Sequence, residues 1–268
     1  MAVLPYNPNM LRTVAATRYV TPLREGGSLP AIIEADDDGL YVLKFRGAGQ
    51  GPKALLAELL GAEIGRALGL PIPEVVFVDL DAEFGRNELD PEIRELLIAS
   101  AGLNLGVDYL PGSLSLDPVS LQAFDPALAA RTAWFDAFIT NVDRTLKNPN
   151  ILLWHREPWL IDHGAAFYFH HTWDGWETRA QSAFPAIRDH VLLGRAASIT
   201  GTGSMAERVL TPSLLAEITA LLPDEWLVDV PFGDPAATRN AYLRYLELRL
   251  AHREIFEQEA ERARAQRL

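Results

Sequence analysis

One stretch near the middle of the sequence constrains the fold more than any other. Asp143 and Asn148 stand five positions apart in it, and Asp162 and Gly164 follow a short apolar stretch whose composition predicts a β-hairpin. The order is a carboxylate, an amide, a hairpin and a second carboxylate. These side chains can act together only if the hairpin returns the chain to one edge of a shared site.

The residue types in this stretch suit phosphoryl transfer. A carboxylate near an attacking hydroxyl orients it and accepts its proton, and this catalytic role is predicted for Asp143. Magnesium prefers oxygen ligands and leaves room for phosphates and waters, so Asn148 and Asp162 are the predicted Mg2+ ligands. Gly164 is expected to allow an unusual backbone dihedral beside the metal. Each residue alone could serve as an ordinary turn or helix end, but their joint order favours chemistry on ATP.

The first part of the chain predicts a small sheet. Strands are expected at residues 13–20, 31–35 and 40–45. A loop between the first two strands can bring backbone N–H groups to phosphate oxygens, through Gly26, Gly27 and Ser28. Lys44 interrupts an apolar strand, where a charge needs solvent or a partner. It is either an outward-facing lysine on an edge strand or a lysine that contacts nucleotide phosphates and a helix glutamate.

A helix is predicted over residues 52–68, with a proline near its start and Gly69 just past its end. It carries Glu58 and Glu63, which are five positions apart and therefore cannot both face Lys44. A strand at residues 74–80 and a mixed region with a helix near 88–100 follow. The extended run that comes next is the predicted hinge, whose backbone would meet the adenine edge at Asp108, Tyr109 and Leu110.

The remainder predicts a mainly helical half. Residues 113–127 have the composition of a linker. Helices are expected at residues 126–140, 185–195, 212–222 and 236–264, with a hairpin at 150–161 and a loop at 198–204. The last helix is expected to pack first and then to fray into solvent.

Composition narrows the functional classes. The chain has no cysteine, which excludes disulfides and thiolate chemistry, and its net charge of −12 disfavours nucleic acid or an anionic membrane as a partner. No window approaches the roughly 18 apolar residues of a membrane span, and the first residues do not resemble a signal peptide. A cytoplasmic enzyme is the expectation.

The catalytic stretch resembles that of the HipA-like kinases, relatives of protein kinases and phosphoinositide lipid kinases. The resemblance lies in Asn141-x-Asp143-Arg144-x-x-x-Asn148 and Ile161-Asp162-His163-Gly164, with weaker landmarks at Gly69–Pro73 and Leu222–Trp226. It implies an α+β, two-lobed protein kinase-like fold, with a small antiparallel-sheet lobe over residues 1–112 and a mainly helical lobe over 113–268. It also favours Glu58 over Glu63 as the partner of Lys44.

The same resemblance implies ATP and Mg2+ as cofactors and a hydroxyl acceptor on a protein serine or threonine. Some family members autophosphorylate in the glycine loop, which makes Ser28 a candidate. Thr145 departs from the histidine that many relatives carry. The separate amino-terminal domain of the larger HipA toxins is not found, so a DNA-binding antitoxin partner has no support.

Three alternatives stay open. A small-molecule kinase of the aminoglycoside-phosphotransferase type would keep the chemistry and change the acceptor, although Asn141 stands where that group has histidine. A pseudokinase would bind nucleotide without turnover. A metal-dependent hydrolase would use Asp162, His163, His170 and His171. The adjacent His170 and His171 would face opposite ways in a strand, and the pattern lacks the helical histidine pair of known zinc motifs.

Overall fold

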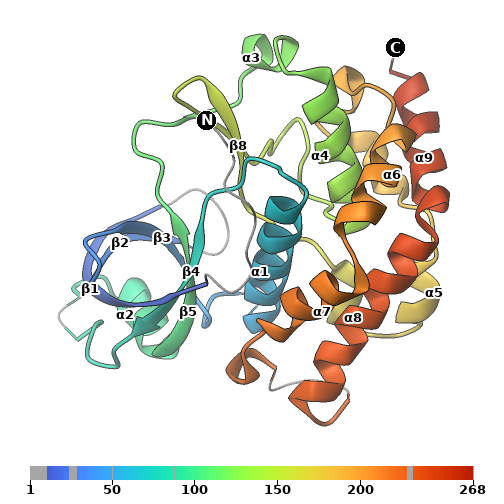
Figure 1. Cartoon of the computed structure of the whole chain (residues 1–268). Helices are drawn as coiled ribbons and strands as arrows, with labels where there is room; N and C mark the ends of the chain where they lie inside the picture. Colours follow the sequence, from blue (N-terminus) through green and yellow to red (C-terminus); the bar gives the residue numbers. More distant parts are fainter. Residues whose placement is uncertain (1–10, 24–28, 50, 87, 228–231, 268) are drawn as a thin grey trace.

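The amino-terminal half of the protein is a closed five-stranded barrel (Figure 1). The computed structural model describes residues 11–23, 29–49, 51–86, 88–227 and 232–267. The barrel strands are β1 (Thr13–Pro22), β2 (Ala31–Ala35), β3 (Leu40–Lys44), β4 (Val75–Leu80) and β5 (Gly102–Asp108). Neighbours pair in the order β1-β2-β3-β5-β4, antiparallel except for the parallel contact of β1 with β4 that closes the barrel.

Strand alternation decides which side chains fill the barrel. Successive residues of a strand point to opposite faces, and Leu43 and Phe45 are buried in the barrel interior. Lys44, which lies between them, must therefore point outward. Helix α2 (Pro91–Ala99) contributes Leu97 to the same interior. The alternation thus sends the one charged residue of β3 toward the rest of the molecule.

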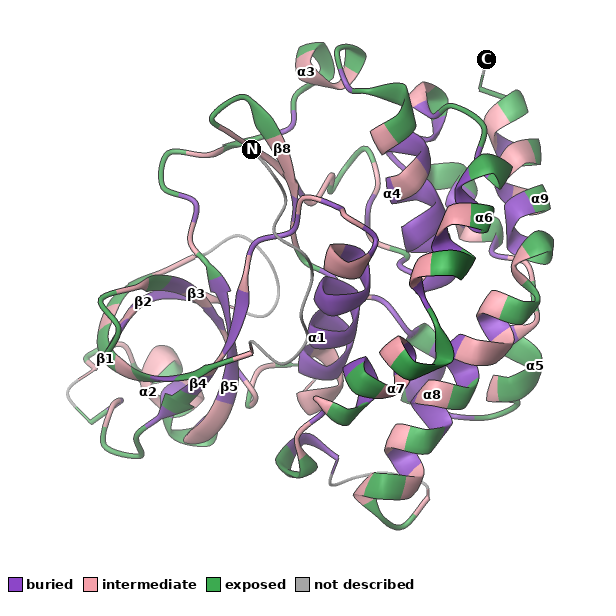
Figure 2. Cartoon of the chain, in the orientation of Figure 1, coloured by how far each residue is buried: buried purple, intermediate pink, exposed green. Residues whose placement is uncertain are grey.

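Helix α1 (Pro52–Ala67) lies between the barrel and the helical half and is buried over most of its length (Figure 2). It packs against β5 on one side and against helix α7 (Pro212–Ala220) on the other. Its apolar residues share one core with the C-terminal helices. The two halves are therefore joined through α1, and the predicted lobe boundary after residue 112 stays a prediction.

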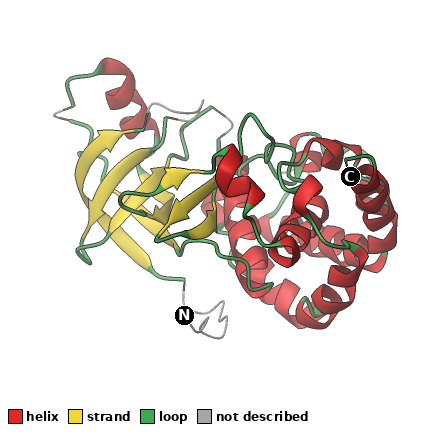
Figure 3. Ribbon diagram, turned by 90° about the horizontal axis from the view of Figure 1, so that it is seen from above, coloured by secondary structure: helices red, strands yellow, loops and turns green. Residues whose placement is uncertain are grey.

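The carboxyl-terminal half is mainly helical, and the two halves lie side by side (Figure 3). Its α-helices, besides α7, are α3 (Pro118–Gln122), α4 (Pro126–Phe138), α5 (Trp176–Ala180), α6 (Thr200–Val209), α8 (Pro235–Ala251) and α9 (Arg253–Ala265). A small sheet holds β6 (Leu114–Ser115), β7 (Ile151–Trp154) and β8 (Glu157–Leu160). Short 3-10 turns are η2 (Tyr168–His171), η3 (Pro185–Asp189), η4 (Leu193–Arg195) and η5 (Asp224–Trp226). The predicted α+β class, with its sheet-rich and helical halves, is confirmed.

Three local predictions were wrong. Residues 200–204 of the expected loop at 198–204 form the first half of α6, and the expected helix at 185–195 is two separate 3-10 turns. The last helix is broken at His252, and its second part does not fray. Beyond this break α9 packs against α4 and α6, burying Phe256 and Ala260.

A segment of the helical half also reaches back to the barrel. The indole nitrogen of Trp226 donates a hydrogen bond to the carbonyl oxygen of Leu103 at 3.0 Å, and the ring meets Phe77 edge-on. Arg46 and Glu225 form an ion pair beside it. This contact, from the landmark Leu222–Trp226, braces the two halves next to α1, which η5 also contacts. None of the helices in the described residues combines the length and apolar character needed to cross a membrane.

Candidate active site

A half-buried lysine joins two carboxylates where the halves meet. The Nζ atom of Lys44 lies 2.7 Å from Oε2 of Glu58 and 2.7 Å from Oδ1 of Asp162. The three residues come from β3, from α1 and from the segment after β8. The predicted pair of Lys44 with Glu58 is therefore present, whereas Glu63 pairs with Arg66 instead.

The electrostatics keep both members of the pair charged. Burial would lower the pKa of Lys44, but the charges of Asp162 and Glu58 outweigh it and raise this pKa above its ordinary value. Burial would likewise raise the pKa of Glu58, but the charge of Lys44 and a hydrogen bond from His163 lower it far below the usual range. A charged lysine is thus held between the two carboxylates.

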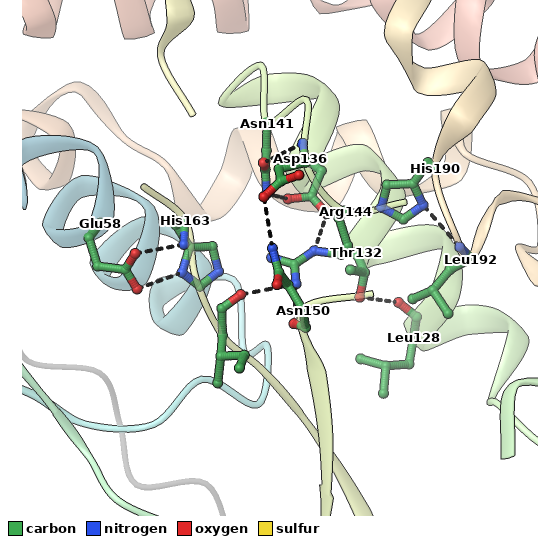
Figure 4. A network of polar contacts seen from close by, with 12 residues as sticks. Glu58, Leu128, Thr132, Asp136, Asn141, Arg144, Asn150, His163, His190 and Leu192 are labelled. Atoms are coloured by element: carbon green, nitrogen blue, oxygen red, sulfur yellow. Dashed lines mark hydrogen bonds and ion pairs between the residues drawn. The ribbon is translucent and has the colours of Figure 1, made fainter. Parts of the chain in front are cut away.

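Glu58 also connects α1 to the segment that carries Asp162. Its Oε2 atom accepts a hydrogen bond from the backbone N–H of His163 at 2.7 Å, and its Oε1 atom lies 3.5 Å from the ring nitrogen Nδ1 of His163 (Figure 4). A Cβ atom at Gly61 would lie 2.6 Å from the Cβ atom of His163, so α1 needs glycine here. One carboxylate therefore sets the positions of both the lysine and the second acid.

The predicted catalytic loop follows α4. Asp143 is half-buried, and its Oδ2 atom accepts a hydrogen bond from the Asn148 side chain at 2.7 Å. Burial raises the pKa of Asp143; the bond from Asn148 opposes this rise and the negative charge of Asp162 adds to it. A raised pKa makes a carboxylate a better proton acceptor. The two acids are therefore close enough for their charges to interact.

The donor set at this place fits Mg2+. The carboxylates of Asp143 and Asp162 repel each other, so a cation between them would be stabilised. The Asp162 side chain is 50% exposed, so a cation can reach it from solvent. Asn148 is exposed and uses its amide nitrogen toward Asp143, which leaves its oxygen as a ligand. Mg2+ is commonly bound by one or two protein carboxylates together with substrate phosphates. A bound ion would supply charge neutralisation for those phosphates.

A buried acid in α4 organises the catalytic loop. Asp136 accepts hydrogen bonds from Nε of Arg144 at 2.6 Å, from Nε2 of His190 at 2.9 Å and from the Asn141 side chain at 2.8 Å (Figure 4). The Arg144 and Asp136 side chains are fully buried. Burial would raise the pKa of Asp136, but the Arg144 charge and the His190 hydrogen bond lower it far below the usual range.

Arg144 extends this network to the hairpin. Its Nη1 atom donates to the carbonyl oxygen of Asn150, at the start of β7, and to that of Ile161 at 3.2 Å. Ile161 directly precedes Asp162. One guanidinium thus joins the predicted catalytic loop, the beginning of the hairpin and the segment that carries Asp162, which is how residues far apart in sequence keep one geometry.

Several residues around the site have left-handed backbone conformations that non-glycine residues rarely adopt. Their φ angles are 55° at Thr140, 48° at Asn150, 57° at Asp162 and 54° at Phe167. Such strain is concentrated at functional sites and persists only where the surroundings enforce it. The prediction that Gly164 provides the unusual dihedral was wrong, because Asp162 itself adopts it.

The predicted hinge lies at the end of β5. The backbone N–H of Asp108 donates to Glu74 at 2.8 Å, and that of Tyr109 donates to Leu40 at 3.0 Å. These two donors are engaged within the barrel. The backbone N–H of Leu110 has no acceptor among the described residues. Of the three predicted hinge residues, Leu110 is therefore the one whose N–H could donate to an adenine ring.

The predicted glycine loop lies outside the described residues, which resume at Leu29. This applies to Gly26, Gly27 and Ser28, whose proposed contacts with phosphate stay predictions. The described ends of β1 and β2 flank this loop, and the N–H of Leu23 donates to Pro30 at 2.7 Å.

The histidines of the hydrolase hypothesis do not gather. His170 is buried against the hydroxyl of Tyr242, 2.9 Å from Nδ1, whereas His171 is exposed. They lie on the turn η2 rather than on a strand. His163 is buried beside Glu58. Within the described part of the chain no group of three or more His, Asp or Glu side chains could hold a metal ion.

Sequence reasoning missed Asp136 and His190. A sequence signal did exist for Asp136, because an acid inside an otherwise apolar helix needs a buried partner. No spacing relates His190 to the loop, since its contact depends on the path of the chain after α5. Arg144 and Asn141 belong to the motif that resembles the HipA-like catalytic loop, but the motif alone did not predict that both donate hydrogen bonds to Asp136.

A lysine on a barrel strand, a helix glutamate and two loop acids in a two-lobed α+β chain are the features of the protein-kinase-like phosphotransferases. The sequence comparison narrows this class. The model of the HipA-like kinase family matches residues 17–254, so the chain belongs to the HipA-like kinases. The comparison with curated proteins gave no match.

Solved structures include similar folds. The Helicobacter pylori proinflammatory kinase CtkA is 12% identical with a TM-score of 0.50, and the alignment covers 95% of this chain and 99% of that chain. The Golgi casein kinase is 14% identical with a TM-score of 0.47, covering 94% of this chain and 72% of that chain. Its Mn/ADP-bound structure is 14% identical with a TM-score of 0.46, covering 94% and 73%. At this identity the likeness to CtkA shows the fold alone.

Proposed function

We propose that the protein is an ATP-dependent kinase that transfers the γ-phosphoryl group to the hydroxyl of a protein serine or threonine. The observation that carries the proposal is the meeting of Lys44 with Glu58 and Asp162 at 2.7 Å each. In this family a charged lysine held by a helix glutamate beside a metal-binding acid serves the nucleotide phosphates.

Each residue has a defined task in this proposal. Lys44 contacts the phosphates and Glu58 holds the lysine in place. Asp143 orients the acceptor hydroxyl and takes its proton, for which its raised pKa is suited. Asn148 and Asp162 hold Mg2+. Further contacts with the nucleotide come from the hinge and the glycine loop, namely Asp108, Tyr109, Leu110, Gly26, Gly27 and Ser28.

ATP turnover with an Asp143→Ala variant tests the catalytic assignment. We expect a loss of about 10²–10⁴-fold in rate, the usual contribution of a positioned proton acceptor, while Mg-ATP still raises the melting temperature. Asp189→Ala, which removes an exposed acid elsewhere, should keep the activity. Equal turnover in wild type and Asp143→Ala would refute the role of Asp143. If Mg-ATP stabilises neither protein, the nucleotide site itself is refuted.

The acceptor is tested separately. Wild type and Asp162→Ala are incubated with a cell lysate, and phosphorylated peptides are compared. New phosphoserine or phosphothreonine with the wild type alone supports a protein kinase. Transfer to small hydroxyl compounds alone supports the aminoglycoside-phosphotransferase type, and nucleotide binding without any transfer supports a pseudokinase.

A further inference from the structure

An exposed threonine lies beside two cations on the segment that follows the metal-binding acid. Thr172 comes ten positions after Asp162, and its Oγ1 atom accepts a hydrogen bond from Nη1 of Arg179 at 3.2 Å. Arg179 is itself exposed, at the end of α5. The hydroxyl is thus accessible and already has a guanidinium as its neighbour.

The second cation comes from α1. The Nζ atom of Lys53 lies 3.2 Å from the carbonyl oxygen of His171. This carbonyl belongs to the peptide bond that leads into Thr172, so the ammonium group lies within about one peptide unit of the threonine. The positive charge of Lys53 also contributes, after burial, to a lowered pKa of His171.

The charges around this threonine favour an anion. Lys53 stands in the first turn of α1, which contains no acidic residue. The acids of the neighbouring segment, Asp174 and Glu177, are exposed to solvent, where water and salt screen their repulsion. A phosphate group would bring about two negative charges and three acceptor oxygens to a place with an arginine and a lysine in reach.

We propose that Thr172 is an autophosphorylation site whose phosphate is held between Arg179 and Lys53. This rests on the proposed kinase function, because the phosphoryl group comes from ATP. The Oγ1 atom of Thr172 attacks the γ-phosphorus, the bond from that phosphorus to the β,γ-bridging oxygen breaks, ADP leaves, and Asp143 of the catalysing copy receives the hydroxyl proton.

The phosphate would regulate the same site through α1. Lys53 and Glu58 lie on one helix, and Glu58 is the residue that holds both Lys44 and the backbone of His163. Lys53 already contacts this segment through the carbonyl oxygen of His171, and a phosphate on Thr172 would add an ion pair to that contact with α1. Phosphorylation of Thr172 is therefore expected to stabilise the arrangement in which Lys44 and Glu58 are paired.

The site is tested with a chain that carries phosphothreonine at position 172 from its synthesis. We expect a melting temperature about 2–4 °C higher than that of the unmodified chain, as one added charge-assisted contact gives in a chain of this size. Lys53→Gln and Arg179→Gln should each remove most of this rise. An unchanged or lower melting temperature overturns the inference, and this readout does not depend on ATP turnover.

The source of the phosphate is tested by mapping phosphorylated residues after incubation with Mg-ATP. Phosphate is expected on Thr172 in the wild type and in Thr178→Ala, a matched exposed threonine on the same segment, but not in Thr172→Ala or Asp143→Ala. Phosphate on an added acceptor or on Ser28, with none on Thr172, overturns the inference and leaves the proposed function intact. If no acceptor is phosphorylated, the proposed function fails, and the installed phosphothreonine still decides whether the site binds phosphate.

Discussion

Replacing Asp136 with asparagine should destabilise the protein strongly, although Asp136 itself contacts no substrate. The acid accepts from Arg144, His190 and Asn141, and the Arg144 guanidinium is fully buried. Asparagine keeps the shape but leaves the arginine charge without a counter-charge in the interior. Removing one partner of a buried ion pair typically costs about 3–5 kcal/mol, which in a chain of this size lowers the melting temperature by roughly 6–20 °C.

The assay is denaturant unfolding of wild type and Asp136→Asn across pH, with Glu34→Gln as a control that breaks the exposed pair with Arg18. The pKa of Asp136 is lowered in the folded state, so its contribution is present above the ordinary aspartate pKa and is lost as the pH falls through the folded value. The difference between wild type and Asp136→Asn should therefore shrink in acid. Equal midpoints at neutral pH, or a difference that does not shrink, would refute this account of the network. The control Glu34→Gln should have the same denaturant midpoint as the wild type.

Three further outcomes are expected. Glu58→Gln leaves Lys44 with one carboxylate partner, so ATP turnover should fall about tenfold or more, and a rate equal to wild type would contradict the positioning role. Trp226→Phe removes the donor to Leu103 and part of a buried ring, which should cost at least about 1 kcal/mol in unfolding free energy; no loss would refute the stabilising role of this contact. Burial lowers the pKa of His170 to about 3, so the wild type should lose stability as the pH falls from about 6.5 toward that value, and His170→Phe should lose less. If the free energy of unfolding falls equally with pH in wild type and His170→Phe, His170 is not a neutral buried histidine.

The chemistry-bearing residues could be found in the sequence because their types and order are local properties. Asp143, Asn148 and Asp162 stand around a hairpin that the apolar pattern predicts, and the structure brings Asp143 and Asp162 within electrostatic range. The choice of Glu58 over Glu63 came from the resemblance, and the pairing with Lys44 agrees with it. The catalytic roles of these residues remain predictions for the experiments above.

Helix ends and breaks were harder to predict because packing overrides local propensity. Residues 198–204 are rich in Gly, Ser and Thr, yet from Thr200 onward they form the start of α6, because its buried face packs against α4 and α9. The break at His252 has no proline or glycine to announce it. It is a consequence of α9 packing on α4, where Glu257 accepts a hydrogen bond from the indole of Trp134 at 2.7 Å.

The sequence by itself determined the α+β class and the residues able to carry phosphoryl-transfer chemistry, since hydrophobic patterning and residue type are set locally. Only the tertiary structure decided that Glu58 also binds the backbone of His163, that Asp136 and Arg144 hold the loops together, and that Lys53 binds the carbonyl oxygen of His171, next to Thr172 in the chain. These contacts join residues up to more than a hundred positions apart. They form only when burial brings distant segments together, because a charged group without solvent must take whichever partner the fold provides.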